Sequence, residues 1–472
     1  MNNAGWGSLG GGSVNYADNI LLMTDSYKVT HWKQYPPGTE AVYSYFESRG
    51  GRFGSVVFFG LQYYLRRYLE GLVVSQEKID LAEAFFSRHF DDAELFNREG
   101  WEYILREHGG RLPVRIRAVP EGTPVPVLNV MMTIENTDPR CFWLPNYLET
   151  LLVQVWYGCT VATLSREMKK LISGYLAETG DPEAIAFKLH DFGYRGVSSV
   201  ESAAMGGAAH LVNFEGSDTL AGCLLAQEYY DAEMPGSSIP ASEHSTITAW
   251  GMPGEVDAFR NMLERYPRGV VACVSDSYDI FRACSEFWGR ELRDAVLARD
   301  GTLVVRPDSG DPPAVVVRVL ELLGEAFGAE RNAKGYRLLP PQIRVIQSDG
   351  IDYEMAGAIL AAVKRSGWSV DNVGFGMGGG LLQKLDRDTQ EFAFKCSEVR
   401  VKGERRQVYK DPITDHAKRS KPGRLKLVLA PDGSLATVAE DAAGQDLLRE
   451  VFRDGQLSAP LRFEDIRRNA AL

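Results

Sequence analysis

The sequence predicts an α/β protein with a parallel sheet at its centre, because one pattern repeats after about residue 184. Short, nearly continuous apolar runs each lead into a polar or glycine-rich loop and then into a helix-like stretch; they cover residues 270–274, 303–305, 343–346 and 373–375. Their starts lie about 30 to 40 residues apart, which is typical of βα units. Strands that are apolar throughout are covered on both faces, so the pattern favours either a βα barrel or an open doubly wound sheet.

The chain before this region gives mixed signals. Residues 41–47 have the aromatic and β-branched density of a strand, and residues 114–119 alternate apolar and basic side chains as a half-buried strand does. Helix-like apolar spacing marks residues 60–72 and 79–89, and the loop 120–126 breaks regular structure.

After the repeated pattern the composition changes again. Residues 425–429 are typical of a strand and residues 443–452 of a helix. We therefore expect four parts: a disordered glycine-rich tail over residues 1–16, a mixed α/β part over 17–180, a βα catalytic domain over 181–384 and a C-terminal segment over 385–472.

The charge balance excludes some functions. The 472 residues contain 52 Lys and Arg against 63 Asp and Glu, a net charge of −11. Such a surface repels duplex DNA and anionic membranes, so we expect no nucleic-acid or membrane partner, and an anionic ligand needs a local cationic site. The best apolar stretch, residues 148–164, is interrupted by Glu149, Gln154 and Gly158, which predicts a buried helix rather than a membrane span.

Cysteine usage and the first residues bear on the compartment. The six cysteines form no C-x-x-C pair, which argues against a disulfide scaffold or a zinc knuckle. Residues 1–16 lack the basic and apolar regions of a signal peptide. We therefore expect a cytoplasmic protein.

Aspartates follow three of the apolar runs, where the carboxyl ends of parallel strands meet. Gathered there, carboxylates suit Mg²⁺, which takes one or two protein oxygens beside phosphate and water, or they hold ribose hydroxyls. The alternative is helix N-capping, which we favour for any single residue but not for the whole set. The set consists of Asp276 and Asp279, Asp308 and Asp311, and Asp349 and Asp352.

The loop after the fourth run is rich in glycine. Residues 374–380 let backbone N–H groups approach an anion, and a helix expected to begin near Leu381 adds positive charge. Residues 384–424 carry an excess of Lys and Arg over Asp and Glu, which favours a phosphate site. The alternatives are a flexible turn and a solvated basic face.

Arg306 stands directly at a strand end, with Pro307 fixing the turn. A guanidinium there suits bidentate contact with phosphate or with a planar polar ligand. The alternative is an ion pair with Asp308.

Aromatic and histidine side chains complete the candidates. Phe192 or Tyr194 can stack on a flat heterocycle, although aromatics more often pack in a core, and adjacent Arg195 makes a wholly apolar setting less suitable. His244 can act as acid, base or nucleophile with Glu243 orienting it, although a lone histidine is more often structural. From the residues alone we predict a Mg²⁺-dependent enzyme that acts on a phosphorylated sugar, and no particular reaction.

Long blocks of the chain resemble the nicotinamide phosphoribosyltransferases: NILLMTDSYKVTHWKQYPPGTEAVYSYFESR, HDFGYRGVSS, EHSTITAWG, SDSYDI, RPDSG, VIQSDGID, GGGLLQK and KRSKPGRL. The resemblance implies transfer of phosphoribosyl from phosphoribosyl pyrophosphate to nicotinamide, giving nicotinamide mononucleotide and pyrophosphate in NAD salvage. It implies a type II phosphoribosyltransferase fold, an irregular βα barrel with a flanking α/β domain built from N- and C-terminal segments. It also implies a homodimer with active sites shared across the interface.

The resemblance assigns roles to particular residues. Phe192 stacks on one face of the pyridine ring and Tyr27 of the partner subunit on the other. Asp218 accepts a hydrogen bond from the carboxamide, and Arg306 holds its oxygen. A carboxylate at Asp218 repels nicotinate and favours the neutral amide. His244 is the residue that ATP phosphorylates, with ATP hydrolysis coupled to the transfer.

The resemblance assigns the remaining substrate contacts as sets: Arg195, Gly378 and Gly379 to the 5′-phosphate; Arg49, Arg387, Lys395, Lys410 and Lys418 to pyrophosphate; Asp276, Asp308 and Asp349 to Mg²⁺ or ribose, with Asp276 and Asp308 as the metal ligands; and Asp25 and Gly350 as further substrate contacts. His244, Asp308 and Arg306 are the expected catalytic residues.

Three alternatives stay open at this point. Nicotinate phosphoribosyltransferase is the nearest one, and Asp218 argues against it. A sugar-phosphate lyase of βα-barrel type needs a Schiff-base lysine at a strand end, and none of the four loops has one. A non-catalytic binding protein is the third. The sequence departs from the family pattern at Met377, Ala272 and Ser348, where we expect altered phosphate affinity or an altered entrance, with unchanged chemistry.

Overall fold

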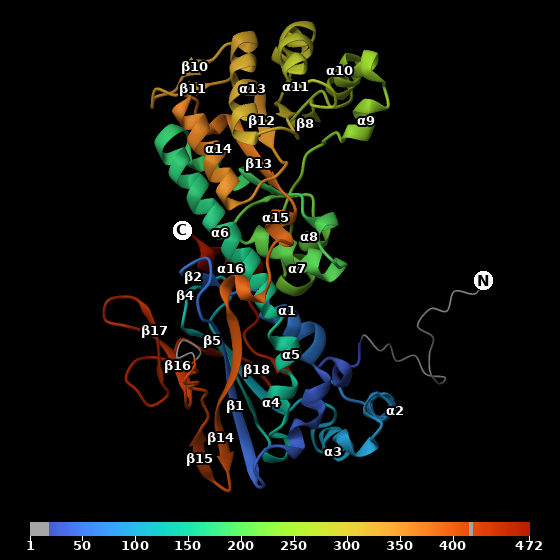
Figure 1. The fold of residues 1–472 in the computed structure, drawn as a ribbon, viewed down its shortest axis with the longest axis vertical. Coiled ribbons are helices and arrows are strands. Elements are labelled where there is room, and N and C mark those ends of the chain that lie inside the picture. The colour runs from blue at the N-terminus through green and yellow to red at the C-terminus, as the bar shows by residue number, and fades with distance from the viewer. Residues whose placement is uncertain (1–17, 415–418) are drawn as a thin grey trace, which may run out of the picture. The chain divides into compact units, whose positions relative to one another are not determined.

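The computed structural model describes residues 18–414 and 419–472 and divides the chain into two compact units. Unit 1 consists of Met1–Thr160 and Arg387–Asn469, and unit 2 of Val161–Asp386 and Ala470–Leu472 (Figure 1). The sequence placed the boundaries after residues 180 and 384. The first boundary lies earlier than predicted, after Thr160, because the long helix α6 (Val155–Thr179) begins in unit 1 and continues in unit 2. The predicted tail and Lys418 lie outside the described residues.

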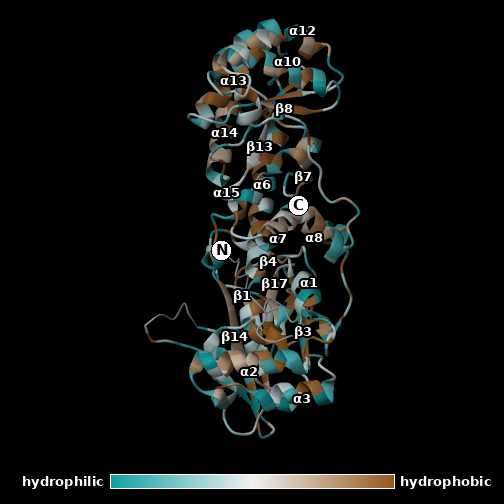
Figure 2. Ribbon diagram, turned by 90° about the vertical axis from the view of Figure 1, so that its right-hand side faces the viewer, coloured by the Kyte–Doolittle hydropathy of each residue, from teal (hydrophilic) through white to brown (hydrophobic). Residues whose placement is uncertain are grey.

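Unit 2 is built on a six-stranded parallel sheet, in the order β7-β6-β13-β12-β9-β8. The strands are β6 (Leu189–Asp191), β7 (Gly216–Ser217), β8 (Val271–Val274), β9 (Leu303–Arg306), β12 (Ile343–Gln347) and β13 (Val373–Met377). The last four coincide with the four apolar runs that the sequence singled out. Strand β8, whose four residues are all apolar, is brown in Figure 2, whereas the helices around it show teal as well as brown faces.

The two edges of this sheet are joined by an extended segment, residues 237–241. Gly216 of β7 forms a parallel bridge with Ser237, and Ala272 of β8 forms one with Ala241. Two backbone hydrogen bonds support each side. Ser217 N–H donates to the Ser237 carbonyl (3.0 Å) and Ser237 N–H to the Glu215 carbonyl (2.8 Å), while Ala272 N–H donates to the Pro240 carbonyl (2.9 Å) and Ser242 N–H to the Ala272 carbonyl (3.0 Å). The sheet therefore curls into an irregular barrel, which decides between the two predicted architectures and confirms the irregular βα barrel.

Helices and short pairs complete unit 2. They are α7 (Val200–Leu211), α8 (Leu220–Tyr230), α9 (His244–Thr248), α10 (Glu255–Arg265), α11 (Ile280–Arg282), α12 (Arg293–Leu297), α13 (Pro312–Phe327), α14 (Tyr353–Arg365) and α15 (Gly379–Leu382), with the hairpin β10 (Glu330–Arg331) and β11 (Arg337–Leu338). The predicted helix near Leu381 is thus one turn long.

Unit 1 contains a seven-stranded antiparallel sheet, in the order β15-β14-β1-β5-β3-β18-β19. Its strands are β1 (Thr39–Ser48), β3 (Val114–Ala118), β5 (Val130–Asn136), β14 (Phe392–Val401), β15 (Glu404–Gln407), β18 (Arg449–Arg453) and β19 (Gln456–Leu457). Because β1 lies between β5 and β14, the sheet interleaves strands from both ends of the chain. This confirms a flanking domain built from N- and C-terminal segments.

The other elements of unit 1 surround this sheet. They are α1 (Leu61–Tyr64), α2 (Gln76–Phe90), α3 (Arg98–His108), α4 (Leu144–Tyr147), α5 (Glu149–Leu152) and α16 (Phe463–Ala470), with the pairs β2 (Ser55–Val57) and β4 (Pro124–Pro126), and β16 (Leu425–Leu429) and β17 (Leu435–Ala439).

Two local predictions were wrong. Residues 443–452 do not form a helix; their second half is β18, which pairs with β3. Leu447, Leu448, Val451 and Phe452 have apolar spacing that also fits one face of a helix, but hydrogen bonding to the sheet prevails. The loop predicted at residues 120–126 ends in the short strand β4, which pairs with β2. Its two prolines are tolerated because this sheet has only two strands, and both are edge strands.

Two further features concern the compartment. Each of the six cysteines is a free thiol, and five of them are buried. No described helix combines the length and the apolar character that a membrane span requires.

Candidate active site

The loops at the carboxyl ends of the barrel strands enclose a cavity of about 380 Å³ in unit 2. Its walls come from the segments that follow β6, β7, β9, β12 and β13. The lining residues are Phe192, Tyr194, Arg195, Asp218, Thr219, Arg306, Asp308, Ser348, Asp349 and Gly378. Positive, negative and aromatic side chains that are far apart in sequence therefore meet at one rim.

The paired aspartates divide into two roles. Asp279, Asp311 and Asp352 cap α11, α13 and α14, and each accepts a hydrogen bond from a backbone N–H in the first turn of its helix. In two of the three pairs the first aspartate, Asp308 or Asp349, lines the cavity. Both alternatives that the sequence left open thus apply, one to each member of a pair.

Asp276 is buried beside the cavity, with its side chain 3% exposed. One carboxylate oxygen accepts hydrogen bonds from the Asp308 backbone N–H (3.0 Å) and the Ser309 hydroxyl (2.6 Å). The other lies 2.9 Å from Nε2 of His244. Since protein donors engage both oxygens, this geometry fits a positioning residue better than the predicted metal or ribose contact.

His244 stands at the start of α9, and its side chain is 46% exposed. The partner that orients it is Asp276. Glu243, which the sequence favoured for this task, instead forms a capping box with Thr246 at the start of α9. The sequence offered no signal for the contact with Asp276, because 32 residues separate the two side chains.

Arg306 and Asp308 face the cavity without forming a close ion pair, since Nη2 and Oδ2 lie 3.9 Å apart. Nε of Arg306 is buried and has no hydrogen-bond partner among the described residues. Oδ1 of Asp308 accepts a hydrogen bond from the Ser348 hydroxyl at 2.6 Å. The guanidinium therefore retains donor capacity for a ligand.

A flat subsite lies at the ends of β6 and β13, where the Phe192 ring packs against the backbone of Gly376. A Cβ built at Gly376 would lie 2.1 Å from Cε2 of Phe192, so only glycine leaves room for the ring. Gly376 thus serves the aromatic side chain rather than an anion. Gly378 and Gly379 differ, because a Cβ on Gly378 would meet nothing closer than 3.5 Å and one on Gly379 nothing within 4 Å.

Asp218 borders the same subsite. Its Oδ1 accepts hydrogen bonds from Nε2 of His190 (2.9 Å) and from the Ser238 hydroxyl. Burial acts to raise the pKa of Asp218, but these hydrogen bonds and the charges of His190 and Arg306 outweigh it and lower the pKa overall. The carboxylate form is therefore held at the cavity wall.

Two supporting residues were missed from the sequence. Asp191 is fully buried and accepts a hydrogen bond from the Gly193 N–H (2.7 Å), while its carbonyl accepts one from the Asp218 N–H (3.0 Å). It ties together the two loops that carry Phe192 and Asp218. Ser238 lies in the segment that joins the barrel edges, and its sequence carries no periodic signal.

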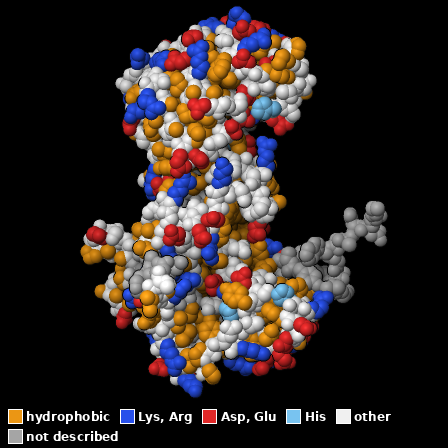
Figure 3. Space-filling view, in the orientation of Figure 1, with side chains coloured by type: hydrophobic (Ala, Val, Ile, Leu, Met, Phe, Trp, Pro, Cys, Tyr) orange, Lys and Arg blue, Asp and Glu red, His pale blue; other side chains and the backbone are white. Residues whose placement is uncertain are grey.

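Unit 1 contains a cluster of four of the cations predicted to bind pyrophosphate, namely Arg49, Arg387, Lys395 and Lys410. Burial lowers the pKa of Lys395, and the like charges of Arg49, Arg387 and Lys410 lower it further against the opposing effect of Glu149. Nη2 of Arg49 is buried and has no hydrogen-bond partner in the part of the chain that the structure describes. On the face seen in Figure 3, blue and red side chains are interspersed.

The other predicted residues of unit 1 lie in or beside a short 3₁₀ segment, Ser26–Lys33. Tyr27 is 60% exposed. Asp25 accepts a hydrogen bond from the Thr150 hydroxyl at 2.7 Å. In unit 2, Gly350 has a φ of +66°, which glycine adopts readily in the turn after Asp349.

The three departures from the family pattern differ in position. Met377 and Ala272 are buried, in β13 and β8. Only Ser348 reaches the cavity, where it binds Asp308. Of the three departures, we therefore expect Ser348 to be the one that alters substrate binding.

The fold and this rim of loops define a type II phosphoribosyltransferase. The chain matches the model of the nicotinate phosphoribosyltransferase (NAPRTase) family over residues 187–456 and that of the nicotinamide phosphoribosyltransferase N-terminal domain over residues 19–116. The chain belongs to this family.

Relatives in the family are similar along nearly their whole length. A nicotinamide phosphoribosyltransferase of Xanthomonas campestris is 53% identical over 97% of this chain and 99% of that protein. One of Acinetobacter baylyi is 34% identical over 97% of this chain and 98% of that protein.

Solved structures support the fold. The nicotinate-nucleotide pyrophosphorylase of Pyrococcus furiosus aligns over 97% of this chain and 96% of its own, with a TM-score of 0.59 and 16% identity. Human nicotinic acid phosphoribosyltransferase aligns over 95% of this chain and 92% of its own, with a TM-score of 0.57 and 17% identity.

Proposed function

We propose that this enzyme transfers the phosphoribosyl group of phosphoribosyl pyrophosphate to nicotinamide, giving nicotinamide mononucleotide and pyrophosphate for NAD synthesis. The observation that carries the proposal is the single cavity in which Phe192, Asp218 and Arg306 meet. A flat ring, an acceptor and a donor match a pyridine that bears a carboxamide. The relatives named for this activity support the same substrate.

The chain's own groups divide the chemistry. Stacking on Phe192 aims the ring nitrogen at the ribose, and the Asp218 carboxylate and Arg306 guanidinium fix the rotation of the carboxamide. The transition state is loose, with positive charge on the ribose, so Asp308 and Asp349 at the rim stabilise it. The cation cluster of unit 1 is suited to bind the departing pyrophosphate, partly from the other chain.

Asp308 and Asp349 fit a Mg²⁺ site, because both line the cavity and, within the described chain, neither carboxylate accepts a hydrogen bond from a cationic side chain. Mg²⁺ uses one or two carboxylates beside phosphate and water, and it would neutralise pyrophosphate charge. Asp276 fits less well, since protein donors engage both of its oxygens.

A product assay tests this function. Purified protein is supplied with Mg²⁺, phosphoribosyl pyrophosphate and either nicotinamide or nicotinate, with and without ATP, and mononucleotide is measured. We expect nicotinamide mononucleotide with a clear preference for the amide. Preference for nicotinate would favour the sister activity, and absence of both products would overturn the proposal.

ATP coupling is proposed to run through His244. In the neutral tautomer whose Nε2–H donates to Asp276, Nδ1 carries the lone pair, and Nδ1 has no hydrogen-bond partner in the described chain. Attack of Nδ1 on the γ-phosphorus of ATP forms the N–P bond, breaks the bond to the bridging oxygen and releases ADP. Water then hydrolyses the N–P bond, which releases phosphate and regenerates His244.

His244→Ala is expected to abolish acid-labile labelling of the protein by [γ-³²P]ATP and the stimulation of transfer by ATP. Basal transfer without ATP stays within about threefold of wild type, because His244 does not line the substrate cavity. Persistent labelling would place the phosphorylated residue elsewhere. His190→Ala is the matched control, and it retains ATP labelling.

The glycine loop gives a second prediction. Gly376→Ala displaces the Phe192 ring, so we expect a loss of about 1–3 kcal/mol of stability and a raised KM for nicotinamide. Gly379→Ala meets no protein atom within 4 Å, so it leaves Tm unchanged but raises the KM for phosphoribosyl pyrophosphate about tenfold. Thermal melts and steady-state kinetics measure both. An unchanged KM for phosphoribosyl pyrophosphate in Gly379→Ala contradicts the assignment of the 5′-phosphate.

The active form is proposed to be a cytoplasmic homodimer. Large apolar side chains stand exposed on α7, on α8 and just after it, at Val200, Leu220, Leu224 and Met234. A second copy of the chain would cover such a surface. The free cysteines fit a reducing compartment.

Mixing two inactive variants tests the shared site. Tyr27→Ala and Asp308→Asn each impair transfer, but dissociation and reassociation of a mixture yields hybrid dimers with one intact site. We expect recovery of about a quarter of wild-type activity, since half the dimers are hybrids and half of their sites are intact. Recovery of none would show that Tyr27 serves the cavity of its own chain, and full activity of Tyr27→Ala alone would show that it serves neither cavity.

A further inference from the structure

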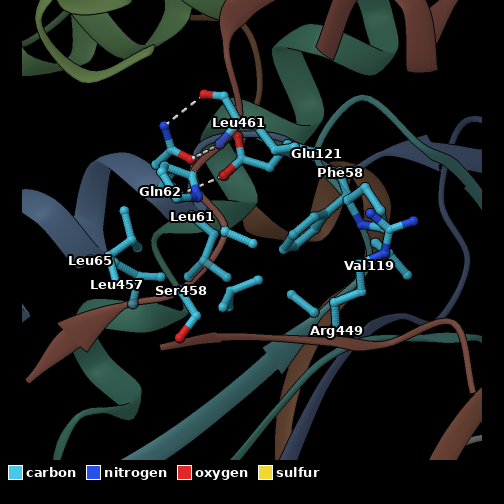
Figure 4. A pocket seen from close by; sticks show the side chains of 15 residues that line it. Phe58, Leu61, Gln62, Leu65, Val119, Glu121, Arg449, Leu457, Ser458 and Leu461 are labelled. Carbon is cyan, nitrogen blue, oxygen red and sulfur yellow. Dashed lines mark hydrogen bonds between the residues drawn. The ribbon is translucent and has the colours of Figure 1, made fainter. Parts of the chain in front are cut away.

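Unit 1 contains a mainly apolar cavity of about 140 Å³, partly open to solvent, that shares no residue with the sites described above (Figure 4). Its floor is formed by Phe58, Leu61, Leu65 and Val119, each at most 2% exposed. An apolar cavity of about this size is large enough to bind benzene. Its dimensions therefore suit a small ring or a short branched chain.

The segment 458–461, here called the arch, covers this floor and is fixed at both ends. The Ser458 N–H donates to the Val451 carbonyl at 2.8 Å. At the other end, the Gln62 side-chain amide both accepts from the Leu461 N–H (2.8 Å) and donates to the Leu461 carbonyl (3.0 Å), as the dashed lines of Figure 4 show. Because hydrogen bonds hold both of its ends, the arch has a defined position beside the apolar residues of the cavity.

The polar groups inside the cavity are already engaged. The Glu121 carboxylate accepts hydrogen bonds from the backbone N–H groups of Gly60 (2.8 Å) and Gln62 (2.6 Å). These bonds stabilise its negative charge. The interior thus has no strong group left to bind a polar ligand, and the buried part of an occupant must be apolar.

Arg449 adds a positive charge to the same lining. It is exposed, and no hydrogen bond or ion pair of its guanidinium is seen within residues 18–414 and 419–472. A guanidinium binds carboxylates by charge-assisted, bidentate hydrogen bonds. We propose that this cavity binds small monocarboxylates with an aromatic ring or a short branched apolar chain, with the carboxylate on Arg449 and the apolar part beneath the arch.

Benzoate is the probe that tests this site. Titration is followed by ligand-observed NMR on the full chain with nicotinamide in saturating excess, so that benzoate is kept out of the pyridine subsite. We expect saturable binding to wild type, a loss of about tenfold in affinity in Arg449→Gln, and no binding in Leu457→Trp, which fills the cavity. Arg453→Gln, on the same strand but outside the lining, is the matched control and keeps wild-type affinity.

The other results are equally decisive. Benzene, which has no carboxylate, tests the apolar part of the cavity, and we expect it to bind wild type and Arg449→Gln with equal affinity. The Tm of each variant reports whether it folds. Absence of benzoate binding to wild type, or equal affinity in Arg449→Gln, overturns the proposal. Binding of benzene without benzoate overturns the assignment to carboxylates.

Discussion

Asp308→Asn is expected to lower kcat/KM for phosphoribosyl transfer by about 10²- to 10³-fold, with little change in Tm. Asp308 lines the cavity beside Arg306 and Asp349, where its negative charge stabilises the positive ribose and helps to hold Mg²⁺. An asparagine oxygen still accepts the hydrogen bond from Ser348, so the fold of the loop is kept. Steady-state kinetics over a range of Mg²⁺ concentrations, together with a thermal melt, measure the effect.

The same loop supplies a matched control. Asp311→Asn removes the same charge three residues later, but asparagine caps a helix about as well as aspartate does, so α13 is retained. We expect wild-type kcat/KM and wild-type Tm for this variant. Equal losses in the two variants would mean that the net charge of the loop matters and that Asp308 has no direct part in catalysis.

Sequence patterns predicted the barrel well because its central strands have an unambiguous local signature. Residues 270–274 and 343–346 are apolar throughout, and such strands are stable only with both faces covered. The clustering of Arg306 and Asp308 with Asp349 then follows from topology, since loops at the carboxyl ends of parallel strands share one rim.

Features set by non-local contacts were beyond sequence reasoning. The segment 237–241 has no strand signature of its own and is extended because it bridges two sheet edges. This position brings Ser238 to Asp218. The choice of Asp276 over Glu243 as the partner of His244 depends on the approach of β8 to α9. Local spacing favoured the neighbour in sequence, and tertiary packing selected the neighbour in space.

The interleaving of unit 1 explains why strong motifs lie at both ends of the chain. β1 pairs with β5 on one side and with β14 on the other, so Tyr45 lies opposite Lys395 in the same sheet. The cluster of Arg49, Lys395 and their neighbours exists only once this pairing forms. Neither terminal segment could build the cation cluster by itself.

Asp218→Asn is expected to reduce the preference for nicotinamide over nicotinate, measured as the ratio of kcat/KM values, by about 10- to 100-fold. The Asp218 carboxylate is kept charged by His190, Ser238 and Arg306, and a second carboxylate beside it is strongly disfavoured. Partial exposure of the side chain to solvent screens this repulsion, which limits the effect to that range. Asparagine keeps an acceptor for His190 and adds a donor for the carboxylate of nicotinate, so most of the change comes from faster turnover of the acid.

Ser238→Ala separates charge from geometry in this prediction. It removes one hydrogen bond to Asp218 and leaves the carboxylate in place, so the preference is expected to change by less than about threefold. Competition experiments with both substrates in one reaction give the ratio directly. If Asp218→Asn leaves the ratio unchanged, discrimination must come from another group that meets the substituent of the ring, and Arg306 is then the first residue to examine, because its guanidinium faces the same cavity.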